Sequence, residues 1–165
     1  LAGKVGAYTS AELGTMRVTE QIDAVQCLGT NPIQYLVLPR FAGIVMASIL
    51  LLFLGLFISI GGSMGVAALV CGVNPLQFLS SIPKFTTLST LLGGVVQSAV
   101  YGFIVAGVAC YKGYTASGGA RGVGRAVTQA AVYTNLFIVI ANFVLSRLLQ
   151  SAEIVWEMWM GGGPT

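Results

Sequence analysis

The chain has 165 residues, of which 56% are apolar and only 8% are charged. Soluble domains carry about a quarter charged residues, so this composition excludes a soluble fold. The high apolar content also excludes a disordered chain. A net charge of +3 is too small to predict nucleic-acid binding. Histidine is absent and the three cysteines are widely spaced, so we expect no histidine chemistry, disulfide framework or metal site.

The first predicted element is a polar helix over residues 9–29. Thr9 and Glu12 have the spacing of a capping box, and Gly29 with Pro32 beyond it is typical of a helix end. Its polar half carries Glu12, Thr15, Thr19, Asp23 and Gln26, with Glu20 at the boundary and Arg17 interrupting the apolar half. From spacing alone, a solvated face and a surface for a basic protein partner are equally good interpretations.

Three stretches without a charged residue follow, at Phe41–Pro83, Phe85–Tyr111 and Ala126–Ser146. Each is long enough to cross a bilayer, which takes about 20 helical residues. The first would be about 65 Å long as one helix, so we expect a break at Gly61-Gly62 and a new helix start at Asn74. The predicted spans are residues 41–60, 89–111 and 126–149, with residues 61–71 extending the first span or lying near the interface.

Residues 112–125 form a glycine-rich, basic segment that we expect to be a flexible connector. Most bases precede the first span or lie in this connector, namely Lys4, Arg17, Arg40, Lys112, Arg121 and Arg125. Alternating spans place both segments on one side, which the positive-inside rule identifies as the cytoplasm. Residues 150–165 are then an external tail. The sequence predicts an all-α integral membrane protein with at least three transmembrane helices.

Three amides lie inside the predicted spans, at Gln97, Asn135 and Asn142. Polar groups at membrane depth usually face other helices or a cavity, and a single interhelical hydrogen bond explains them equally well. Small residues recur at four-residue spacing in Gly43/Ala47, Gly61/Gly65 and Gly102/Ala106, which favours close helix packing.

Catalytic motifs are missing from the sequence. It contains no G-x-x-x-x-G-K-[ST] phosphate loop, and its few carboxylates show no pairing for acid–base or two-metal chemistry. We therefore expect neither an enzyme nor a cofactor. If ATP drives this protein, the ATPase is another chain.

The run ELGTMRVTEQIDA, residues 12–24, resembles the signature of the MlaE family of ABC transporter permeases, which includes plastid lipid-importer permeases. Asn31-Pro32, Leu38-Pro39-Arg40, KGY at 112–114 and GVGRA at 122–126 also resemble family features. The resemblance gives a permease domain over residues 1–149. Family members have further residues before the signature, so we expect the N-terminal part of the family domain to be absent here.

The resemblance implies a function and a set of partners. The family's permease is a homodimer that sits on cytoplasmic ABC ATPase subunits, below an MCE-domain protein on the outer side. Its signature segment is a coupling helix, which assigns the ATPase contact to Glu12, Thr15, Arg17, Thr19, Glu20 and Asp23. Phospholipid passes through a cavity between the two copies, for which Gln97, Asn135 and Asn142 are the candidates. The expected location is a bacterial inner membrane or a plastid inner envelope.

Two other functions compete with lipid transport by a permease. A secondary transporter of a small solute would usually carry acids or bases inside its spans for ion coupling, and these spans hold only amides and hydroxyls. A non-transporting membrane scaffold would use its cytoplasmic helix only to recruit a partner.

Overall fold

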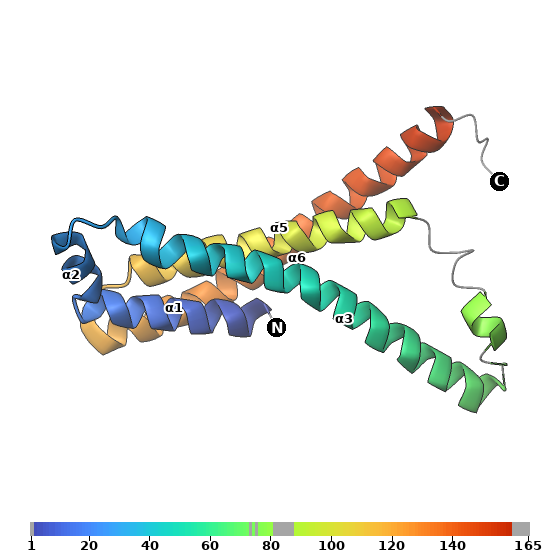
Figure 1. The fold of residues 1–165 in the computed structure, drawn as a ribbon, viewed down its shortest axis with the longest axis horizontal. Helices are drawn as coiled ribbons and strands as arrows, with labels where there is room; N and C mark the ends of the chain where they lie inside the picture. Colours follow the sequence, from blue (N-terminus) through green and yellow to red (C-terminus); the bar gives the residue numbers. More distant parts are fainter. Residues whose placement is uncertain (1, 73, 75, 81–87, 160–165) are drawn as a thin grey trace.

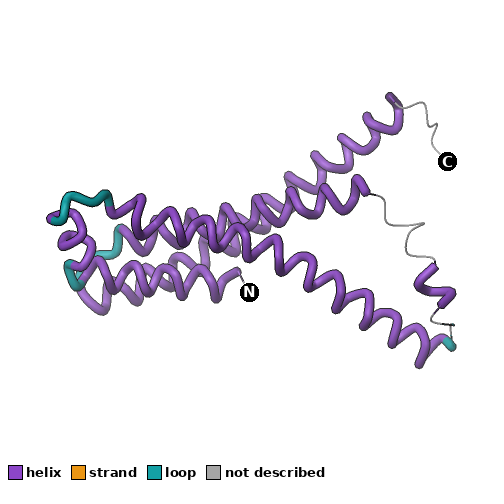
Figure 2. Tube along the Cα trace, in the orientation of Figure 1, coloured by secondary structure: helices purple, strands orange, loops and turns teal. Residues whose placement is uncertain are grey.

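The computed structural model describes residues 2–72, 74, 76–80 and 88–159. These residues are almost entirely helical, with short loops gathered mainly at one end (Figure 2). The elements are α1 Ala2–Val18, α2 Gln21–Cys27, a π-helical segment η1 Ile33–Val37, α3 Leu38–Cys71, α5 Leu88–Tyr114 and α6 Gly119–Trp159. Residues 76–80 form one further short helix.

Within the described part of the chain, three helices are long and apolar enough to cross a membrane, at Ile33–Val70, Ser89–Tyr114 and Gly119–Ala152. Large apolar side chains point outward along them, such as Phe57 at 78% exposed and Leu69 at 89%. These side chains suit a lipid environment, where helices satisfy their own backbone hydrogen bonds. The prediction of an all-α integral membrane protein is confirmed.

Helix α5 is the centre of the bundle. It packs against α1, α3 and α6, and α1 also packs along α6 (Figure 1). Small residues make up most of the core, as at Ala106, Ala109, Ala126 and Ala130. Small side chains allow helix backbones to approach closely, which is how helices associate in lipid. At the end opposite to α2, the helices α3, α5 and α6 diverge (Figure 1).

The predicted helix over residues 9–29 is two helices in the structure. Helix α1 already starts at Ala2, so Thr9 is a buried mid-helix residue and the capping-box interpretation was wrong. Helix α1 ends at Val18 because Glu20 adopts a left-handed backbone conformation, with φ 59° and ψ 15°. As a result, α1 lies in the bundle beside α5 and α6 (Figure 1). Of the two helices, only α2 lies at the end of the bundle.

Helix α3 does not break at Gly61-Gly62, contrary to the prediction, and it ends only before Gly72, whose φ is 63°. A break inside lipid would leave backbone groups without partners, which costs several kcal/mol, whereas a helical glycine costs about 1 kcal/mol. The predicted helix start at Asn74 is confirmed, because its side-chain Oδ1 accepts a hydrogen bond from Leu76 N–H at 3.1 Å.

The expected flexible connector over residues 112–125 is also mostly helical, since α5 continues to Tyr114 and α6 begins at Gly119. Gly118 and Gly119, with φ of 89° and 68°, form the tight reversal between them. Gly113 serves packing instead, because a Cβ there would lie 2.8 Å from Leu13 Cβ in α1. Helix α6 extends to Trp159, so residues 150–159 continue the third helix, and residues 160–165 of the predicted tail lie outside the described residues.

Candidate functional site

The six residues predicted to contact an ATPase are divided by the turn between α1 and α2. Glu12, Thr15 and Arg17 belong to α1, whereas Thr19, Glu20 and Asp23 belong to the turn and α2. Both threonines are exposed, and their hydroxyls donate hydrogen bonds to the carbonyl four residues earlier, at 2.8 Å and 2.9 Å. The hydrogen atoms of both hydroxyls are therefore already engaged within the chain and are not available to a partner.

Arg17 connects three helices at this end of the bundle. Its Nη1 donates to Asp23 Oδ1 at 2.5 Å, which joins α1 to α2. Its guanidinium also lies 6.0 Å from the ring centroid of Tyr114, near the end of α5. Because both charged side chains are more than a third exposed, the ion pair contributes at most about 1 kcal/mol. Its main effect is to hold α2 in one orientation.

A second ion pair connects α1 to the beginning of α3. Arg40 Nη2 lies 2.7 Å from Glu12 Oε1 and also 3.7 Å from Met16 Sδ. The two ends of this pair are 28 residues apart, so no helical periodicity reveals it. The Glu12 carboxylate is therefore already paired within this chain. Arg40 is a further functional candidate, which the sequence pattern did not identify as a partner of Glu12.

The residues left free for a partner define what we call the α2 surface, namely Glu20, Gln21, Ala24, Gln26 and Leu28. All five are exposed, with Leu28 at 82%. Among the described residues, the Glu20 carboxylate has no ion pair or hydrogen bond. If residues 9–29 formed one continuous helix, Leu28 would lie on the same face as Leu13 and Ile22, which are buried. The break at Glu20 separates α1 from α2, and Leu28 is exposed instead.

Two of the three predicted cavity residues meet in one polar cluster between α5 and α6. Gln97 Nε2 donates to Asn142 Oδ1 at 3.0 Å and to Tyr101 Oη at 2.5 Å. Tyr101 Oη in turn donates to the same Asn142 oxygen at 2.7 Å, and Ser146 Oγ does so at 3.3 Å. The tyrosine and the serine were not among the sequence candidates.

The polar cluster borders an open groove on α6 of about 540 Å³, which contains both apolar and polar side chains. It is lined by Val139, Asn142, Phe143, Ser146, Arg147 and Gln150. Asn135, the third candidate, is elsewhere: a Cβ on Gly3 of α1 would lie 3.2 Å from its Nδ2. It therefore faces the α1 side of the bundle and lies outside the groove.

Comparison with known proteins shows which family this chain resembles. The family model described as "Permease MlaE" matches residues 1–148. A "Probable ABC transporter permease protein" of Synechocystis sp. is 41% identical over 165 residues, covering 100% of this chain and 59% of the relative. One of the same description from Rickettsia typhi is 39% identical over 149 residues, covering 90% of this chain and 58% of the relative.

A chloroplastic protein of Arabidopsis thaliana, named TRIGALACTOSYLDIACYLGLYCEROL 1, is 34% identical over 146 residues, covering 88% of this chain and 42% of the relative. The chain thus spans less than two thirds of the length of these relatives. Its membrane-spanning helices and its bacterial and chloroplastic relatives fit an inner membrane or a plastid envelope. On the match over residues 1–148, the chain belongs to the MlaE family of permeases.

Proposed function

We propose that this chain is part of the permease subunit of an ATP-driven transporter that moves glycerophospholipid between membranes. A separate cytoplasmic ABC ATPase supplies the energy, and the permease itself carries no catalytic site. The observation that carries the proposal is the α2 surface, an exposed acidic and apolar patch at the basic end of a membrane bundle. Relatives described as ABC transporter permeases support the same conclusion.

The ATPase is proposed to bind the α2 surface, with Leu28 as an apolar anchor and Glu20 as the free acid. Glu20 is in a left-handed conformation, which is unfavourable for a residue with a Cβ by about 1–2 kcal/mol. Strain of this kind is often retained where it positions a functional group. The pairs Arg17–Asp23 and Arg40–Glu12 connect α2 and α1 to α3, and Tyr114 connects them to α5. A displacement of α2 would therefore be transmitted to α1, α3 and α5.

For the transported lipid we propose contact with the polar cluster of Gln97, Tyr101, Asn142 and Ser146. This cluster supplies hydrogen-bonding groups beside a groove that also exposes the apolar side chains of Val139 and Phe143, a combination suited to a molecule with a polar head and apolar chains. We further propose that two permease copies enclose the lipid path and that an MCE-domain protein covers the outer side. Asn135 is a weaker candidate because its amide faces Gly3.

Charge reversal at the free acid tests the ATPase contact. We expect the full-length Glu20→Lys permease to lose its ATPase on co-purification while remaining inserted in the membrane. Glu20 is a sharper choice than Asp23, because reversal at Asp23 would also break the ion pair with Arg17. Lys4→Glu is the matched control, since Lys4 is exposed on α1 and has no described ion pair.

Two results would contradict the proposal. An ATPase that stays bound to Glu20→Lys and to a Glu20→Lys/Leu28→Ser double variant would exclude docking at the α2 surface. Unchanged distribution of phospholipid between membranes after depletion of the permease would exclude lipid transport and favour a scaffold.

A further inference from the structure

A second pocket, of about 290 Å³, lies where α5 turns into α6, at the same end of the bundle as α2 (Figure 1). Ala116 and Ala126 are buried residues of its lining, and Gly122 packs so closely against the preceding turn that an added Cβ would overlap the Ser117 carbonyl oxygen. Its walls carry the cations Lys112, Arg121 and Arg125. Among the described residues, none of those that line it carries a carboxylate.

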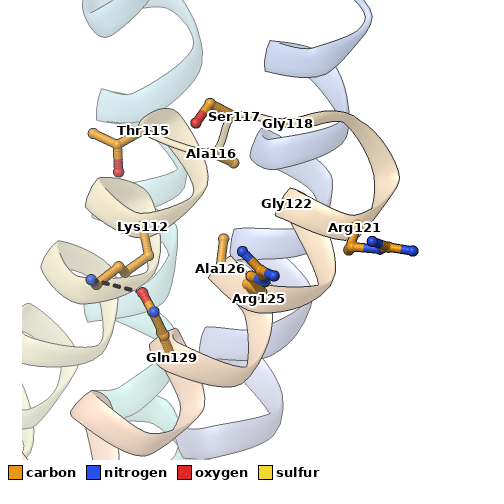
Figure 3. Close-up of a pocket in the computed structure, with 10 residues that line it drawn as sticks. All are labelled: Lys112, Thr115, Ala116, Ser117, Gly118, Arg121, Gly122, Arg125, Ala126 and Gln129. Atoms are coloured by element: carbon orange, nitrogen blue, oxygen red, sulfur yellow. Dashed lines mark hydrogen bonds between the residues drawn. The ribbon is translucent and has the colours of Figure 1, made fainter.

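The three cations are not neutralised within the described part of the chain. The ion pairs found there join Arg17 to Asp23 and Arg40 to Glu12, and neither involves a cation of this pocket. Lys112 is held in place, because its Nζ donates to Gln129 Oε1 at 3.1 Å (Figure 3). The same Nζ lies 4.7 Å from the ring centroid of Tyr133. Arg125 lies between Lys112 and Arg121 in that view, and Arg121 points outward (Figure 3).

A concave site with an ordered lysine and exposed arginines suits a phosphate group. Guanidinium groups bind phosphate oxygens through paired N–H donors, and an ammonium adds a compact charge. The hydroxyl of Ser117 at the rim is an additional donor. A basic pocket between transmembrane helices on the cytoplasmic side is a typical position for the headgroup of an anionic lipid.

We propose that this pocket binds the phosphate of an anionic phospholipid from the adjacent leaflet, at a site separate from the transport groove. Gln129 and Asn142 border the two sites and are separated along α6 by about 20 Å, so one lipid headgroup cannot occupy both. A lipid whose headgroup carries its own positive charge would be disfavoured, because that charge would lie beside the three cations.

The test uses the full-length permease in detergent, with bound lipid counted by native mass spectrometry. Phosphatidylglycerol is the anionic probe and phosphatidylcholine the zwitterionic one. We expect Lys112→Gln and Arg125→Gln each to weaken phosphatidylglycerol binding about fivefold, the value for about 1 kcal/mol per surface cation. Arg125→Lys should retain most of the binding, which separates loss of charge from loss of fold.

Lys4→Gln is the control, because it removes one exposed positive charge from α1 outside the pocket. It should leave phosphatidylglycerol binding unchanged. Equal binding of the two lipids, or equal weakening by Lys4→Gln and Arg125→Gln, would overturn the proposal. Displacement of phosphatidylglycerol by an equal concentration of inorganic phosphate would show that the ligand is a soluble ion, and the assignment to a lipid would then be wrong.

Discussion

Glycine has two different roles in this bundle, depending on what its Cα faces. At Gly102 in α5, an added Cβ would overlap Ser48 Oγ and lie 3.0 Å from Val45 Cα in α3. At Gly43, Gly61 and Gly65 in α3, no atom lies within 4 Å of such a Cβ. Of the three small-residue pairs in the sequence, only Gly102/Ala106 packs helices together within the described chain, because only that pair faces a neighbouring helix.

At the residue scale, Gly102→Ala should destabilise the protein by about 1–3 kcal/mol, since the added methyl forces α3 and α5 apart. The comparison is Gly107→Ala on the same helix, where nothing lies within 4 Å of the added carbon. Thermal unfolding of both variants in detergent measures the difference. Equal melting temperatures would show that the α3–α5 crossing is looser than the structure indicates.

At the element scale, the orientation of α2 depends on contacts that a helical wheel does not represent. The wheel treats residues 9–29 as one cylinder, whereas Glu20 rotates the chain and separates Leu13, which is buried, from Leu28, which is exposed. The side chain that then holds α2 is Arg17, through Asp23 and Tyr114. A residue with φ of 59° that is not glycine has no clear signal in the sequence.

Removing the charge of Arg17 should therefore loosen α2 without unfolding the bundle. For Arg17→Gln we expect amide hydrogen exchange over residues 21–27 to become about fivefold faster, as the loss of up to about 1 kcal/mol of local stability requires. Exchange in the middle of α5, around the buried residues Ala106 and Ala109, should not change. Arg121→Gln also removes an exposed arginine charge, but one without a described ion pair, so an equal effect in α2 would refute the role of Arg17.

At the scale of the whole molecule, α2 and the α5–α6 turn lie at one end, and residues 76–80 belong to the segment that follows the other end of α3 (Figure 1). The α1–α2 turn and the α5–α6 turn therefore share one end of the bundle (Figure 1), and the assignment of that end to the cytoplasm stays a prediction. Cys27 is exposed on α2, so a label on it can report on which side of the membrane α2 lies.

A variant with Cys71→Ser and Cys110→Ser keeps Cys27 as the only cysteine among these 165 residues. In intact cells it should not react with a membrane-impermeant maleimide until the membrane is permeabilised. Ser80→Cys, with all three native cysteines replaced by serine, should react without permeabilisation, because Ser80 is exposed beyond the other end of α3. The opposite pattern would mean that the positive-inside rule gives the wrong orientation for this chain.

Composition and charge placement by themselves determined that this is an all-α membrane protein with spans at three places, because lipid tolerates only helices with few charges. The polar run ELGTMRVTEQIDA by itself indicated the family. Only the tertiary structure decided that α1 belongs inside the bundle, that Glu12 and Asp23 are paired, and that Glu20 and Leu28 remain free. It also brought Gln97 to Asn142 and left Asn135 apart. Most of these outcomes depend on contacts between residues distant in sequence, and the others depend on the backbone turn at Glu20, so helical periodicity contains no information about them.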